Sequence, residues 1–160
     1  MSEKTTFEQQ LAEHGRLIYT NVGVSMMPLL REGKDIMIID RIDGHDCKKY
    51  DAVFFVRPWV HKRGRYVVHR ILKCNEDGTY YIVGDHDTRG ETVKPENILG
   101  KLTAVVRNGK TINVTDKKYL FYVHLWCDFY PVRCLILKMK RFVRRCLGFV
   151  KRKVVGLLGK

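Results

Sequence analysis

Short runs of β-forming residues, separated by tight-turn dipeptides, fill the chain from residue 35 to residue 114. Each run is rich in β-branched and aromatic residues and is bounded by turn signals such as Asp77-Gly78 and Asn108-Gly109, two dipeptides favoured in tight hairpins. Short strands joined by hairpins predict a mainly β, coiled antiparallel structure. The strands predicted in this region are 35–40, 51–57, 65–72, 79–83, 101–107 and 111–114.

The segment before this β region has a different pattern. Apolar residues at helical spacing from Thr5 to Gly15 predict a short N-terminal helix that ends at the glycine. Leu17–Val24 then has the pattern of a further strand, and Met26–Arg31 that of a single helical turn closed by Gly33.

Charge divides the 160 residues into two parts, although the net charge of +13 belongs to the whole chain. Residues 1–116 carry 18 Lys and Arg against 16 Asp and Glu, whereas residues 117–160 carry 12 basic residues against one acid, Asp128. We therefore expect a near-neutral β domain at 1–116 and a basic, aromatic and amphipathic helical tail at 117–160.

The tail has the composition of a helix that lies on a membrane. Between residues 138 and 160, apolar residues recur at three- and four-residue steps with Lys and Arg between them. This pattern predicts contact with an anionic membrane surface through 138–160. Docking of the apolar stripe on the domain is an alternative, and nucleic acid is the least favoured partner. Residues 119–137 are apolar but interrupted by polar residues, and they make a poor transmembrane span.

Cysteine usage and the N-terminus bear on the compartment. The five cysteines are an odd number at irregular spacing, which argues against both a disulfide framework and a zinc site. Residues 1–15 are polar and acidic, without the apolar core of a cleavable signal peptide. We expect a cytoplasmic or peripherally membrane-associated protein that uses no cofactor and no metal.

Ser25 is the first candidate for chemistry, because the only other serine is Ser2. Its hydroxyl either caps the predicted helical turn or acts as a nucleophile, and a nucleophilic serine needs a base within hydrogen-bond reach. His69 is one of six histidines and lies inside the predicted strand 65–72, where it is either exposed to solvent or paired with another side chain.

The loop that follows strand 79–83 holds three acids within seven residues, namely Asp85, Asp87 and Glu91. An ordinary solvated loop has this composition, and so does a weak site for a hard metal ion. The spacing does not match a calcium-binding loop, so a metal is disfavoured.

Three segments in this order resemble type I signal peptidases. Residues 25–30 resemble the nucleophile box of that family, in which Ser-Met is followed by any residue and Pro. Residues 66–71 resemble the general-base box, with His69 where bacterial members have lysine, as in the endoplasmic-reticulum-type members. Residues 84–87, followed by 93–101, resemble the Gly-Asp-Asn box and its downstream strand. The resemblance covers about residues 17–107 and implies the coiled β fold of the signal peptidase and LexA-like superfamily.

The same resemblance implies roles for single residues. Ser25 would be the acyl-forming nucleophile and His69 its general base, while Asp85, Asp87 or Glu91 would orient the imidazole. The backbone N–H of Ser25 would be one oxyanion donor, and the substrate would be a peptide or a preprotein.

Two departures from the family pattern qualify this hypothesis. Gly23 occupies a position where many signal peptidases carry a second hydroxyl, and residues 1–15 do not resemble the family's N-terminal membrane anchor. A LexA-like self-cleaving repressor is disfavoured, because there is no DNA-binding domain, no Ala-Gly linker and no lysine at position 69. The leading hypothesis is a serine endopeptidase at a membrane surface. The alternative is a non-catalytic relative that binds a membrane or a peptide.

Overall fold

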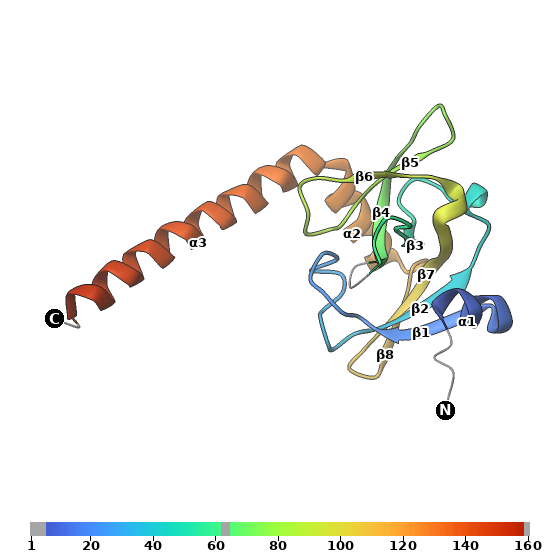
Figure 1. Ribbon diagram of the computed structural model, residues 1–160, viewed down its shortest axis with the longest axis horizontal. Helices are drawn as coiled ribbons and strands as arrows, with labels where there is room; N and C mark the ends of the chain where they lie inside the picture. The colour runs from blue at the N-terminus through green and yellow to red at the C-terminus, as the bar shows by residue number, and fades with distance from the viewer. Residues whose placement is uncertain (1–5, 62–64, 159–160) are drawn as a thin grey trace.

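The computed structural model describes residues 6–61 and 65–158, with side chains up to residue 148. An antiparallel sheet of eight strands forms the body, and three α-helices accompany it (Figure 1). The helices are α1 (Phe7–His14), α2 (Lys117–Asp128) and α3 (Tyr130–Leu158). The strands are β1 (Arg16–Thr20), β2 (Ile36–Arg41), β3 (Ala52–Val56), β4 (Tyr66–Cys74), β5 (Tyr80–Val83), β6 (Glu91–Val93), β7 (Ile98–Arg107) and β8 (Lys110–Asn113). The predicted mainly β, antiparallel architecture is confirmed.

Strand β7 has 10 residues and pairs with three other strands, β2, β3 and β8. The strand order is β1-β2-β7-β3-β4-β5-β6, with β8 also paired to β7. Register shifts occur on β2 between Ile38 and Ile39 and on β3 between Phe54 and Phe55. Such irregularities bend and twist a strand, so they favour a bent sheet over a flat one.

The predicted N-terminal helix is present as α1. Thr6 caps it through a capping box with Gln9, and Gly15 ends it in the left-handed conformation at φ 67°. Leu11 of α1 is buried in a core that includes Leu17 of β1 and Ile39 of β2. A second core lies around β3, β4 and β5 and includes Phe55, Ile71 and Ile82.

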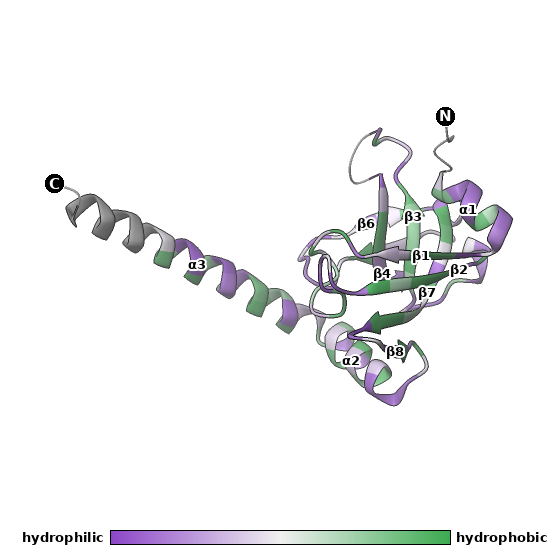
Figure 2. Cartoon of the chain, turned by 90° about the horizontal axis from the view of Figure 1, so that it is seen from below, coloured by the Kyte–Doolittle hydropathy of each residue, from purple (hydrophilic) through white to green (hydrophobic). Residues whose placement is uncertain are grey.

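Helix α2 packs against the β-structure through one face. Tyr119, Val123 and Cys127 recur every four residues and are buried, in contact with residues such as Leu72 and Ile112. Helix α3 follows after a sharp bend and extends away from the body (Figures 1 and 2). The helical character predicted for residues 117–160 is confirmed over the described part of that segment.

Three local predictions differ from the structure. The strand predicted at 17–24 ends at Thr20, because the chain turns back and Asn21 pairs with Asp35 and Gly33 through backbone hydrogen bonds. The helical turn predicted at 26–31 is a series of turns with one isolated hydrogen bond from the Leu30 N–H to the Met26 carbonyl. Strand β6 was not predicted, because it is only three residues long.

No single helix in the described residues combines the length and the apolar composition that a membrane crossing needs. Helix α2 and the first part of α3, up to Gly148, meet those requirements only as a pair, and the pair is bent by 80°.

Because α2 packs on the β-structure through one face, alanine substitutions at a buried and at an exposed apolar residue of α2 should affect stability differently. Val123 is 2% exposed and Leu125 is 50% exposed. Val123→Ala should lower the free energy of unfolding by about 2 kcal/mol, because it leaves a cavity in a packed interface. Leu125→Ala is the matched control and should change it by less than about 0.5 kcal/mol. Urea denaturation measures both values, and equal effects would show that α2 does not pack in this way.

Candidate active site

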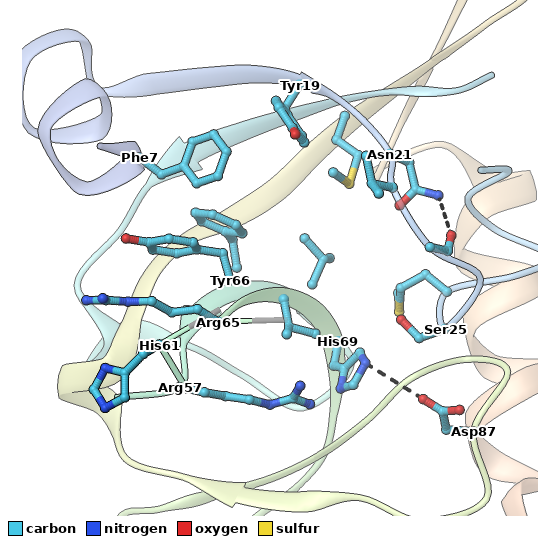
Figure 3. Close-up of a pocket in the computed structure, with 17 residues that line it drawn as sticks. Phe7, Tyr19, Asn21, Ser25, Arg57, His61, Arg65, Tyr66, His69 and Asp87 are labelled. Carbon is cyan, nitrogen blue, oxygen red and sulfur yellow. Dashed lines mark hydrogen bonds and ion pairs between the residues drawn. The ribbon is translucent and has the colours of Figure 1, made fainter. Parts of the chain in front are cut away.

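A cavity of about 740 Å³ opens between α1, the segment that follows β1, and strands β3 and β4 (Figure 3). Ser25 and His69 lie at the same end of it, with Asp87 beside the imidazole. Aromatic and aliphatic side chains line much of the rest, including Phe7, Tyr19, Phe54, Tyr66 and Val68. The cavity therefore combines polar groups at one end with an apolar wall, as ligand pockets commonly do.

Ser25 lies in a turn that is anchored to the core on one side. Met26 is 2% exposed and Leu30 is fully buried. Before the serine, Gly23 adopts φ 104°, a backbone conformation that favours glycine, and the Asn21 side chain donates to the Gly23 carbonyl at 3.0 Å. No helix begins at Ser25 in the described structure, so the capping role considered from the sequence does not apply.

Gly84 allows the serine turn and the acidic loop to approach one another. A Cβ at this position would lie 2.6 Å from the Ser25 carbonyl oxygen, 2.5 Å from Asp87 Oδ2 and 3.1 Å from His69 Nε2. These groups therefore surround one point, and only glycine leaves room for them. The His86 N–H donates to the Ser25 carbonyl at 2.7 Å, which ties the serine turn to the loop.

His69 is buried on β4 with one ring nitrogen near each of two acids. The residue is 6% exposed and its ring lies beside Phe55, with ring centroids 5.9 Å apart. Nδ1 is 3.5 Å from Glu91 Oε1, and Nε2 is 3.8 Å from Asp87 Oδ2. Glu91 is the nearer acid, but 3.5 Å is an ion-pair distance, and Nδ1 makes no hydrogen bond within the part of the chain that the structure describes. A proton on Nδ1, facing Glu91, would leave the lone pair of Nε2 directed toward the cavity.

Arg57 holds Glu91 in its charged form. Arg57 Nε donates to Glu91 Oε2 at 2.8 Å, and a second nitrogen of the guanidinium pairs with Oε1. Burial alone would raise the pKa of the Glu91 carboxyl. The interactions with His69 and Arg57 outweigh burial and lower that pKa to about 2. Glu91 is therefore an anion at neutral pH, available to stabilise a positive charge on the imidazole.

Asp85 makes other contacts and is not the acid beside the imidazole. It is fully buried, and its carboxylate accepts two hydrogen bonds from Arg70, at 2.9 and 2.8 Å. The Tyr122 hydroxyl donates to the same carboxylate at 2.9 Å. Among the residues that the structure describes, Asp85 forms no ion pair with His69.

Helices α2 and α3 hold the loop from residue 84 to residue 91 through its backbone carbonyl groups. Trp126 Nε1 donates to the Asp85 carbonyl at 2.7 Å. The next three carbonyls accept at 3.2 to 3.3 Å: that of His86 from Arg141, that of Asp87 from Arg133 and that of Thr88 from Tyr130. The candidate acids therefore depend for their position on residues of the tail.

Sequence reasoning missed several of these residues. Arg57 and Arg70 were given no role, and neither were the aromatic residues of α2 that contact the loop. Gly84 was noted only as part of the Gly-Asp box, without the close approach that requires it. An arginine directly after His69 inside a strand was the one available signal, because a charge in such a strand calls for a partner. The partner itself lies 15 residues further along the chain and could not be assigned by pattern alone.

The Ser25 hydroxyl and the His69 imidazole are not joined in the described structure. The Ser25 hydroxyl makes no hydrogen bond with His69, and the Ser25 N–H donates to no protein acceptor within the described residues. Catalytic hydrogen bonds commonly tighten only when substrate is bound. Among the described residues, no group of three or more His, Cys, Asp and Glu side chains has the arrangement of a metal site.

Comparison of this chain with protein-family models, with curated proteins and with solved structures gave no match.

The low pKa of Glu91 predicts a pH effect on stability. In the unfolded chain this carboxyl binds a proton near pH 4.5, whereas in the folded protein it binds one only near pH 2. The stabilisation is therefore complete above pH 4.5 and is lost as the pH falls toward 2, at about 1.4 kcal/mol per pH unit. Glu91→Gln should remove this part of the slope in denaturation curves measured from pH 6 down to about pH 3. Glu96→Gln, at an exposed position, is the control, and equal slopes in the two variants would contradict the assignment.

Proposed function

We propose that this chain is a serine endopeptidase of the signal-peptidase-like type, with Ser25 as nucleophile, His69 as general base and Glu91 as the acid that orients the imidazole. The observation that carries the proposal is the position of His69. Its Nδ1 faces an ionised carboxylate, and its Nε2 faces the end of the cavity that Ser25 lines. A base oriented in this manner is the central requirement for serine-dependent acyl transfer.

The proposed reaction has two steps. Ser25 Oγ attacks the carbonyl carbon of the scissile peptide bond while His69 Nε2 takes the hydroxyl proton. The imidazolium then gives that proton to the leaving amine, and an acyl-enzyme remains on Ser25. In the second step water attacks the ester with His69 again as base, which releases the acid and restores the hydroxyl. Glu91 stabilises the imidazolium in both steps. The Ser25 N–H, which has no acceptor among the described residues, would be an oxyanion donor.

The substrate class follows from the cavity and from the resemblance at residues 25–30 and 66–71. An apolar wall suits an extended peptide with apolar side chains, so we propose a preprotein or a signal-peptide-like segment cleaved after a small residue. The competing function is a non-catalytic peptide-binding protein. The absence of a Ser25–His69 hydrogen bond in the described structure favours that second candidate and makes a turnover experiment decisive.

Cleavage of a signal-peptide-like substrate by the purified protein tests the proposal. Ser25→Ala and His69→Ala should each lower kcat by about 10⁴-fold or more, because the two groups act as one unit. His86→Ala is the matched control, since it removes a histidine from the neighbouring loop but keeps the backbone N–H that binds Ser25, and it should retain turnover close to wild type. Wild-type turnover in Ser25→Ala would refute the proposal. Binding of the peptide without cleavage by the wild type would support the peptide-binding alternative.

A second experiment distinguishes the two acids near His69. Glu91→Gln should lower kcat by about 10²- to 10⁴-fold, because the amide removes the charge that stabilises the imidazolium. Asp87→Asn is the matched substitution on the Nε2 side and should cost less than about 10-fold. Steady-state kinetics on folded variants measures both effects. The opposite order would make Asp87 the orienting acid.

A further inference from the structure

One face of α3 is apolar and uncovered. Val132, Ile136, Met139 and Val143 are separated by four, three and four residues, so they share one side of the helix. We call the set to which they belong the outer face of α3. Its members are 44% to 67% exposed: Val132, Leu135, Ile136, Met139, Phe142, Val143 and Leu147. Hydrophobic and hydrophilic bands alternate along the coloured part of this helix in Figure 2.

The opposite side of α3 is fixed to the domain. Arg133 and Leu137 are each 3% exposed, and Arg141 donates to the His86 carbonyl at 3.2 Å. These three residues are spaced four apart and form a second side of the helix. Because they set the rotation of α3 about its axis, the outer face points away from the β-structure. In the described part of α3, Leu137 therefore packs on the domain while the outer face does not.

Charge identifies the occupant of the outer face. Helix α3 contains no acidic residue. Of its exposed basic residues, Lys138 and Lys140 flank the outer face, and Arg144 and Arg145 lie on the rest of the helix circumference. A second copy of the chain would bring two strongly basic tails together, which is electrostatically unfavourable. A nucleic acid would neutralise the charge but leave the apolar residues in water. An anionic lipid surface accepts both groups, because the apolar side chains enter the interface while the basic ones meet headgroups.

We propose that the outer face of α3 is a docking surface for anionic lipid bilayers. The surface begins at Val132, inside the part of α3 that contacts the domain. A bound helix would therefore lie on the membrane with its inner side still attached to the loop that carries Asp87 and Glu91. This proposal does not depend on the proposed endopeptidase activity and is tested without it.

Sedimentation of the full chain with lipid vesicles tests this surface. The protein should bind vesicles that contain about one-third phosphatidylserine, should bind phosphatidylcholine vesicles much more weakly, and should be released by salt. Phe142→Gln should weaken binding by about 10-fold or more, because the side chain no longer enters the interface. Ile18→Gln is the matched control, since Ile18 is 64% exposed and Phe142 67%, and it should bind like wild type.

A charge series completes the experiment. Arg144→Gln combined with Arg145→Gln should lower affinity for the anionic vesicles by roughly 30-fold. Lys73→Gln combined with Lys110→Gln removes two exposed charges from the β-structure and should have little effect. Circular dichroism of each variant checks that it is folded. Equal losses in both double variants, or no vesicle binding by wild type, would overturn the proposal. A dimer in sedimentation equilibrium that Phe142→Gln dissolves, with vesicle binding unchanged, would overturn it in favour of a second copy.

Discussion

The buried ion pair between Arg70 and Asp85 is the interaction on which the arrangement of this site depends. Both side chains are fully removed from solvent. Burying two charges is costly by several kcal/mol each, and the cost is offset only where geometry and further hydrogen bonds are good. Here the pair is bidentate, and Arg70 also donates to the Tyr50 carbonyl and to the Tyr119 hydroxyl. Burial opposes the charge on Arg70, but the attraction of Asp85 outweighs it and raises the arginine pKa.

This pair explains why residues adjacent on β4 contact different parts of the structure. Successive side chains of a strand point to opposite faces, so His69 enters the cavity while Arg70 turns toward α2. The acids of the loop after β5 are divided in the same way: Asp85 binds Arg70, and Asp87 lies near His69. Loss of Asp85 would leave Arg70 as an unpaired buried charge and would free the loop that carries the candidate acids. Structural stability and the placement of the acids therefore rest on the same contact.

The sequence predicted most of the strands of the sheet. Alternating β-branched and aromatic residues, together with Asp77-Gly78 and Asn108-Gly109, predicted where the strands lie. This was possible because strand and hairpin patterns involve only residues that are close together in the sequence. The choice among Asp85, Asp87 and Glu91 could not be made from the sequence. The positions of these acids depend on Arg57, which lies 34 residues before Glu91 and binds it, and on Arg70, which binds Asp85. The turn at Ser25 was also misjudged, because buried Met26 and Leu30 shape it through tertiary contacts.

Covalent trapping tests the central claim, that Ser25 is a nucleophile activated by His69, most directly. The protein is treated with a serine-directed acylating probe and the adduct is located by mass spectrometry of the digested chain. We expect a single adduct at Ser25, formed much more slowly in His69→Ala and at the wild-type rate in His86→Ala. An adduct of equal yield in Ser25→Ala, or labelling whose rate is independent of His69, would contradict the account.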